Sequence, residues 1–153
     1  MNSFQHENVS QNILLVCPPF TQLNTPYPAT AYLKGFLNTQ SVDCTQIDLG
    51  LETILRLFSK AGLEELFAVA SENIDGASDN SLRIYNLRES YISTIDSVIG
   101  FLQDNDPTLS HFICKRNFLP EASKFEQMED LEWAFGSMGI RDKARHLATL
   151  YLE

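Results

Sequence analysis

Histidine and cysteine are the side chains best suited to ligate a metal or attack a substrate, and this chain carries few of them. No pair of its cysteines, Cys17, Cys44 and Cys114, has the C-x₂-C spacing of a zinc or redox site. His111 and Cys114 are three residues apart, and we interpret them as a solvated or capping histidine beside a buried thiol. Cys17 ends an apolar run, so we interpret it as a small buried side chain rather than a nucleophile.

The first strand–loop–helix stretch lacks the glycines with which a backbone wraps a phosphate. Neither G-x-G-x-x-G nor G-x₄-G-K-[ST] follows the apolar run Ile13–Cys17. Asp48 stands near the end of a second apolar stretch, where a dinucleotide fold places a ribose-binding carboxylate. Without the glycines we interpret Asp48 as the cap of the helix that follows it. The sequence therefore argues against a pyrophosphate-binding loop.

The loop from Pro18 to Tyr27 is instead rich in proline, and we call it the proline lip. Prolines at 18, 19, 26 and 28 stiffen it, and its other side chains are flat apolar rings and hydroxyls. Such a surface suits a large, flat, mostly apolar ligand better than a bare pyrophosphate. A tight connection without any ligand is the alternative. The predicted cofactor-binding residues are Pro19, Phe20, Thr21, Thr25 and Tyr27.

The elements that must position this lip are a strand, a helix and a second strand. Ile13–Cys17 is apolar without alternation, which predicts a strand covered on both faces. Val42–Leu49 predicts the second strand. Between them Tyr32, Leu33, Phe36 and Leu37 form one stripe of an amphipathic helix. This pattern predicts a right-handed βαβ unit, and ligands of open α/β sheets bind beyond the carboxyl ends of the strands.

After residue 50 the pattern becomes helical. We expect two helices joined around Gly62, a loop over 73–81 and one long helix from Tyr85 to Leu102. Asp106 and Pro107 are a good cap and first residue for the next helix. Further helices are expected at 121–135 and 141–151, and we interpret the charges of the latter as a solvated face. The charges are Arg141, Lys143 and Arg145.

The predicted fold class is thus an α/β start, with one βαβ unit of an incomplete Rossmann-like sheet, followed by a mainly α-helical region. We expect a loose N-terminus over 1–11, the βαβ opening over 12–50 and a helical insert or extension over 51–153. Two strands make a weak sheet, and the last helix has no capping residue at "TLYLE". We therefore expect the chain to be a piece of a longer protein.

The overall composition and net charge of the chain limit which kinds of partner and which cellular compartment are to be expected. The chain has 153 residues, 44% of them hydrophobic, and a formal net charge of −9. A negative field repels phosphate backbones and anionic lipid, so we expect no nucleic-acid and no membrane partner. The sequence has no apolar stretch long enough to span a bilayer and no secretory signal pattern. Few, scattered cysteines fit a reducing compartment, so the predicted location is cytoplasmic.

Three segments resemble the N-terminal region of the B12-binding radical S-adenosylmethionine proteins, the Fe–S oxidoreductase family. They are "LLVCPPF" (14–20), "PYPATAYLKGFL" (26–37) and "CTQIDLGLE" (44–52). The final "FGSMGIRDKARHLATLYLE" (135–153) is similar to a helical insert of one bacterial branch. The helical middle of the chain carries no such motif.

The resemblance implies a cobalamin-binding α/β domain followed by a partial barrel that holds a [4Fe–4S] cluster on C-x₃-C-x₂-C. In such proteins the cluster cleaves S-adenosylmethionine to start radical chemistry, often methyl transfer or ring rearrangement. This chain departs from the pattern, because its cysteines cannot form C-x₃-C-x₂-C and it has no D-x-H-x-x-G cobalt-ligand motif. The resemblance therefore implies a part of such an enzyme without catalytic residues of its own, and no cofactor bound by this chain alone. Its implied partners are the remaining domains of the same polypeptide.

Two other interpretations remain at this stage. One is a non-enzymatic helical interaction module with a βαβ start. The other is a small flavodoxin-like binding domain, which would need additional strands within 109–114 or 147–152. If the chain is a piece of a longer protein, its own helices would cover its exposed strand edge, or a second copy would pair with it there as a homodimer.

Overall fold

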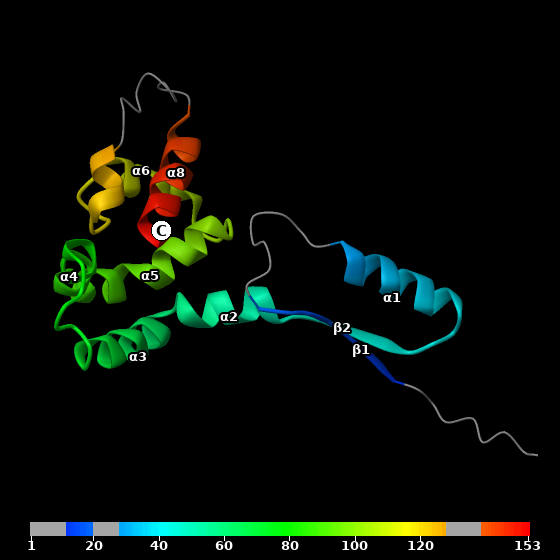
Figure 1. Cartoon of the computed structure of the whole chain (residues 1–153). Helices are drawn as coiled ribbons and strands as arrows, with labels where there is room; N and C mark the ends of the chain where they lie inside the picture. The colour runs from blue at the N-terminus through cyan, green and yellow to red at the C-terminus, as the bar shows by residue number, and fades with distance from the viewer. Residues whose placement is uncertain (1–11, 20–27, 128–138) are drawn as a thin grey trace, which may run out of the picture. The chain divides into compact units, whose positions relative to one another are not determined.

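The structure, a computed structural model, describes residues 12–19, 28–127 and 139–153. The predicted loose N-terminus, 1–11, lies outside these ranges. The chain divides into two compact units, Met1–Ile54 and Leu55–Glu153. The first carries the strands and the second is helical, so the α/β start followed by a helix-rich region is confirmed (Figure 1). The predicted boundary after residue 50 falls inside α2 (Leu49–Leu57), the helix in which the two units meet in sequence.

The first unit is built on a parallel pair of strands, β1 (Ile13–Cys17) and β2 (Cys44–Asp48). They pair in register from Ile13 opposite Cys44 to Cys17 opposite Asp48. Parallel strands need a crossover connection, and α1 (Ala29–Thr39) provides it. The predicted βαβ order is confirmed. Both carboxyl ends lie at the same edge, with Pro18 and Pro19 directly beyond β1.

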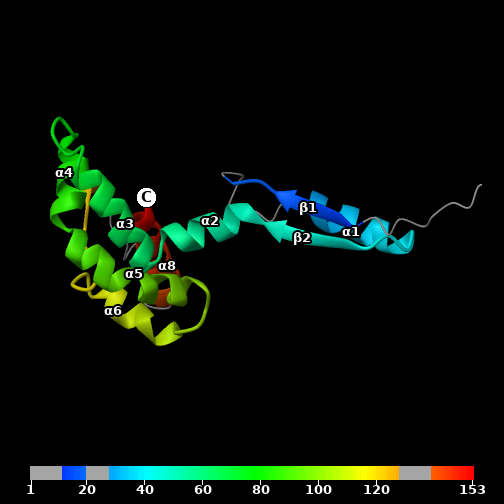
Figure 2. The same cartoon turned by 90° about the horizontal axis from the view of Figure 1, so that it is seen from below.

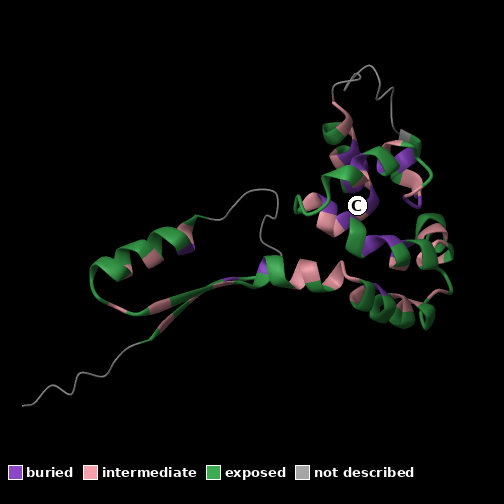
Figure 3. Cartoon of the chain, turned by 180° about the vertical axis from the view of Figure 1, so that it is seen from behind, coloured by how far each residue is buried: buried purple, intermediate pink, exposed green. Residues whose placement is uncertain are grey.

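Helix α1 contacts the sheet with a different face from the one its apolar stripe predicts. Thr30 is buried, and Lys34 and Leu37 are half-buried, at the spacing of one helix face. Tyr32 and Phe36 are instead 77% and 61% exposed. The reason is local, because Gln46 on β2 donates a hydrogen bond of 2.9 Å to the Thr30 hydroxyl and so fixes the first turn. In Figure 3 most of α1 has the colour of exposed residues.

The prediction that β1 is covered on both faces does not hold within the described part of its unit. Residues alternate between the two faces of a strand, and Cys17 is buried while Leu14 and Val16 are 55% and 40% exposed. Figure 2 shows α1 on one side of the β1–β2 pair. The first unit thus presents two apolar surfaces to solvent: the open sheet face and the outer face of α1.

The second unit packs its helices around one core. The core is centred on α5, α6 and α8, and its most completely buried large side chains come from all three. Figure 3 shows the buried residues of this unit concentrated on facing sides of these helices. The elements are α3 (Lys60–Ser71), α4 (Asp79–Asn86), α5 (Arg88–Leu102), η1 (Pro107–Leu109), α6 (Ser110–Cys114), η2 (Ser123–Gln127) and α8 (Ile140–Leu152). The fully buried large side chains are Phe101, Ile95, Ile113, Leu147 and Val98.

The joint between the first two helices after β2 is at Phe58–Ser59 and not at Gly62. Ser59 caps α3 by accepting a hydrogen bond from the Gly62 backbone N–H at 3.1 Å. Gly62 lies in the first turn of α3, where an added Cβ would stand 2.1 Å from the Arg56 carbonyl oxygen. The glycine therefore allows the end of α2 to approach the start of α3 closely.

The expected long helix from Tyr85 to Leu102 is two helices, α4 and α5, which meet at Leu87. Ser78 starts α4 earlier than expected, because its hydroxyl accepts a hydrogen bond from the Ser81 N–H. At the break, the Arg88 guanidinium donates a hydrogen bond of 3.2 Å to the Tyr85 carbonyl, in addition to the backbone bonds that end α4. The predicted turn at Gly76 is confirmed by its φ of +85°.

The remaining helix predictions are confirmed in part. Asp106 caps the turn at Pro107 by accepting from the Thr108 N–H, and α8 matches the helix expected at 141–151. Of the stretch 121–135, the described part contains only the short η2, and 128–138 lies outside the described residues. The ranges 109–114 and 147–152 are helical, so the flavodoxin-like interpretation does not find its additional strands there. Among the described residues, no helix combines the length and apolar character that crossing a bilayer requires.

Candidate functional site

The described part of the proline lip lies at the carboxyl end of the parallel strands. Pro18 and Pro19 follow β1 directly, and both are exposed. Pro19 is the one predicted cofactor-binding residue whose position is described. Phe20, Thr21, Thr25 and Tyr27 lie outside the described residues.

Both described ends of the lip are fixed to the sheet. Cys17, at its start, is 3% exposed, in agreement with the interpretation as a small buried side chain. At its other end Pro28 precedes α1, and its carbonyl accepts a hydrogen bond from the Tyr32 N–H at 3.0 Å. The bond between Gln46 and Thr30 then ties this first turn to β2. The described residues on either side of the lip, Cys17 and Pro28, therefore both belong to the βαβ framework.

Asp48 is the last residue of β2 and lies at this edge of the sheet, opposite Cys17. Its carboxylate accepts a hydrogen bond of 2.9 Å from the Leu51 N–H in the first turn of α2. This is the geometry of a helix cap, and the negative charge also suits the N-terminal end of a helix dipole. The capping interpretation is confirmed, so Asp48 already has a structural role.

The cysteines and histidines do not assemble into a site among the described residues. No group of three or more His, Cys, Asp or Glu side chains there is placed to hold a metal ion. Cys114 donates a hydrogen bond of 3.3 Å to the Ile140 carbonyl, and His111 is exposed. Burial raises the pKa of the Cys114 thiol, and the nearby Lys143 lowers it by a smaller amount. Cys114 is thus a protonated packing residue at neutral pH.

The basic residues of α8 are not simply a solvated face. Arg141 and Arg145 both donate hydrogen bonds to the carboxylate of Asp104, the former at 2.5 Å. These bonds, first from Arg141 and then from Arg145, hold the pKa of Asp104 below its usual value. Asp104 has a φ of +65°, just after α5 ends, so this cluster connects the end of α5 to the start of α8. Sequence spacing could not reveal it, because Asp104 is 37 residues from Arg141.

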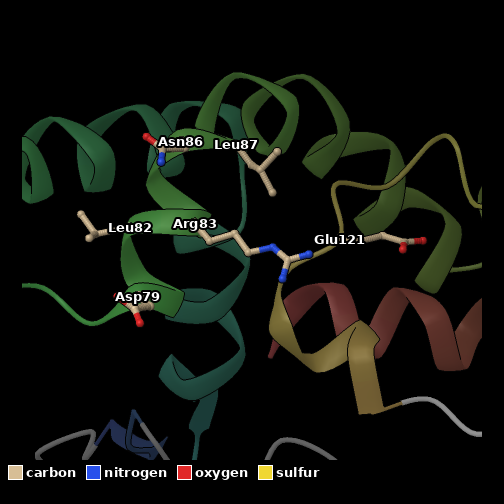
Figure 4. A pocket seen from close by; sticks show the side chains of 6 residues that line it. All are labelled: Asp79, Leu82, Arg83, Asn86, Leu87 and Glu121. Atoms are coloured by element: carbon tan, nitrogen blue, oxygen red, sulfur yellow. The ribbon is translucent and has the colours of Figure 1, made fainter.

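A shallow hollow of about 440 Å³ lies next to α4, and Figure 4 shows six of the side chains that line it. Arg83 crosses it and forms an ion pair with Glu126, while Glu121 on the opposite side is held by Arg116 through two bonds of 2.6 Å. Each of these charges already has an opposite partner within the protein. Asp79, at the start of α4, is the third charged residue of the lining. One carboxylate beside charges that are already paired does not have the arrangement of an acid–base or nucleophilic site.

A second cavity, of about 160 Å³, lies in the helical unit among α3, α4, α5 and α8. Its wall includes Tyr151, whose hydroxyl donates to the Tyr91 carbonyl at 3.1 Å and is bonded to the Thr94 hydroxyl at 3.0 Å. Burial raises the pKa of Tyr151, so its hydroxyl stays protonated at any physiological pH. Sequence reasoning missed this cavity because its residues come from segments up to 95 positions apart, Phe58 and Glu153 at the extremes.

No family model matches this sequence, and neither a curated protein nor a solved structure matches it.

Proposed function

We propose that residues 12–50 form the opening of the cobalamin-binding sheet of a B12-binding radical S-adenosylmethionine protein, with 51–153 as a helical insert. One observation carries this proposal. A parallel, in-register strand pair ends at a proline-rich segment and leaves the apolar residues of its other face without cover. A larger sheet with its cofactor at this edge would use both features.

The exposed apolar residues are the reason to place this unit in a larger sheet. Leu14 and Val16 face solvent from the open side of the sheet and are 55% and 40% exposed. Complete burial of such a side chain from full exposure is worth about 1.5–3 kcal/mol, so covering these two would stabilise the fold by roughly half of that each. An isolated two-stranded sheet is of marginal stability, and parallel sheets are normally covered on both faces. Further strands and covering helices from the same polypeptide would supply both the stability and the second wall of the cleft.

The role proposed for this chain is to bind cobalamin and not to supply catalytic residues. Its three cysteines cannot provide C-x₃-C-x₂-C, so the [4Fe–4S] cluster and the S-adenosylmethionine that it cleaves belong to the remaining domains. Cobalamin would lie against the lip, where Phe20 and Tyr27 offer flat surfaces and Thr21 and Thr25 offer hydroxyls. The full-length protein would be the enzyme, and this segment one wall of its cobalamin cleft.

The first test is the natural open reading frame that contains these residues. It should encode C-x₃-C-x₂-C downstream, and the absence of this motif would leave the non-enzymatic helical module as the better interpretation.

The second test incubates the full-length product with hydroxocobalamin and then separates free cofactor by gel filtration. We expect a corrin absorption spectrum to elute with the full-length protein and not with residues 1–153 alone.

Matched variants locate the cofactor. Phe20→Ala in the lip should reduce the retained cobalamin at least tenfold, and Phe112→Ala, at a 54% exposed position of the helical unit, should not. Equal retention in the two variants would remove the lip from the site. Sedimentation equilibrium of the isolated chain tests the homodimer, which its uncovered strand edge would allow. A monomer would contradict the prediction of a homodimer and would leave the cobalamin proposal unaffected.

A further inference from the structure

The cavity of the helical unit is separate from the site proposed above. It lies within residues 58–153, and helices α3, α4, α5 and α8 all contribute to it. No role in the proposed cobalamin cleft requires it. Whether it binds a ligand therefore does not depend on the outcome of the cobalamin tests.

Its inner wall is apolar and already ordered by the core. Leu63, Tyr91 and Ile95 line it and are 5%, 8% and 1% exposed. The Tyr91 and Tyr151 rings are stacked with centroids 4.9 Å apart. A wall held in place in this way does not have to reorganise when a ligand enters, which lowers the entropic cost of binding.

Most of the polar side chains that line the cavity in the described part of the chain have a partner within the protein. The Tyr151 hydroxyl bonds to Thr94 and to the Tyr91 carbonyl, and the Asn80 side-chain oxygen accepts two hydrogen bonds from Ser123. Lys124 and Glu153 form an ion pair of 3.4 Å at the cavity. Among the described residues that line the cavity, the cation Lys124 and the anion Glu153 therefore neutralise each other, and a charged ligand would have to break this pair.

The volume of the cavity limits the size of the ligand that it can bind. The cavity measures about 160 Å³, and apolar protein cavities of about 150 Å³ lined by Leu, Ile and Phe accept benzene. A longer chain or a fused ring system exceeds this volume and would extend out of the cavity past its rim. We propose that this cavity is a binding site for an uncharged apolar ligand, or ligand moiety, of one six-membered ring.

Fluorobenzene is a suitable probe because its ¹⁹F signal reports binding directly. We expect saturable binding of one fluorobenzene per chain, with benzoate binding at least tenfold more weakly because of its charge. Leu66→Trp should reduce fluorobenzene affinity at least tenfold, since Leu66 lines the cavity and is 45% exposed at its rim. Val69→Trp is the matched control, on the same helix at a 62% exposed position that does not line the cavity.

A second measurement keeps the test independent of how the variants fold. In the unaltered chain, benzene protons should show intermolecular nuclear Overhauser effects to the methyl groups of Leu63 and Ile84. The proposal is overturned by non-saturable binding, by saturable binding without those effects, by benzoate binding as tightly as fluorobenzene, or by a folded Leu66→Trp variant with unchanged affinity.

Discussion

Gly62 provides the sharpest test of the helical unit, because replacing it by alanine should have the opposite effect to the usual one. An alanine in place of glycine within a helix normally stabilises a protein by about 0.4–1 kcal/mol. At Gly62, however, the new Cβ would stand 2.1 Å from the Arg56 carbonyl oxygen and 2.5 Å from that of Leu57. Both are backbone atoms of α2, so no side-chain rotation can relieve the contact.

The magnitude follows from the shift that the backbone must make. To reach the 3.0 Å below which real Cβ contacts essentially never fall, α2 and α3 must separate by roughly 0.9 Å at this point. Leu63, the next residue, is 5% exposed in the core, so the shift also disturbs its packing. Overpacking of this kind costs about 1–3 kcal/mol. After the gain in helix propensity, Gly62→Ala should destabilise the chain by about 1–2 kcal/mol.

Gly100 is the matched control, because it also lies within a helix, α5, and nothing stands within 4 Å of its added Cβ. Gly100→Ala should therefore stabilise the chain by about 0.4–1 kcal/mol. Urea unfolding followed by circular dichroism at 222 nm measures both variants. In thermal unfolding about 1 kcal/mol corresponds to a Tm change of about 4–8 °C for a domain near 100 residues. If Gly62→Ala is as stable as Gly100→Ala, the close approach of α2 and α3 is wrong.

Three further predictions concern the polar contacts of the helical unit. Tyr151→Phe removes the buried hydroxyl bonded to Thr94 and should cost about 1 kcal/mol in urea unfolding, whereas Tyr32→Phe, at a 77% exposed ring, should cost nothing measurable. Asp104→Asn should lower the Tm at pH 7, and the difference from the unaltered chain should start to shrink near pH 4 and disappear only below the lower folded pKa of Asp104. The reason is that a carboxyl with a depressed pKa contributes stability above its unfolded pKa, and this is lost as the pH falls through the folded one; a difference that persists at low pH would contradict the ion-pair origin. Ser59→Ala removes the cap of α3 and should cost about 0.5–2 kcal/mol, measured by urea unfolding; an unchanged midpoint would contradict the capping role.

Several elements of the fold could be predicted from local pattern alone. The apolar runs at β1 and β2 with a helix between them gave the βαβ order, since strand and helix periodicity are properties of neighbouring residues. Asp106 followed by Pro107 predicted the turn that starts there. Local pattern also predicted the break before α3 at Gly62, whereas the break lies at Ser59, which caps α3. Either residue type can end a helical pattern, so the sequence alone does not distinguish them. Only the packing of α2 on α3 shows why the glycine is needed.

Of the candidate sites, too, some could be predicted from the sequence and others could not. The proline lip is a sequence feature, and its four prolines and the residues between them were visible without any structure. The cavity of the helical unit and the cluster around Asp104 were not, because each joins residues of several elements that are distant in the sequence. From the sequence, the arginines of α8 predict only an exposed helix face. The structure shows that Asp104, just after α5, lies next to them.

By itself, then, the amino-acid sequence determined the βαβ order of the first unit, the helical character of the second, the glycine-free lip after β1 and the absence of a cluster-binding cysteine motif. Only the tertiary structure decided which apolar residues are covered. The stripe of α1 predicts contact with the sheet, but the bond between Gln46 and Thr30 turns another face inward and leaves Tyr32 and Phe36 exposed. The physical reason is that periodicity fixes which side chains share a face, whereas contacts with distant residues determine what that face meets.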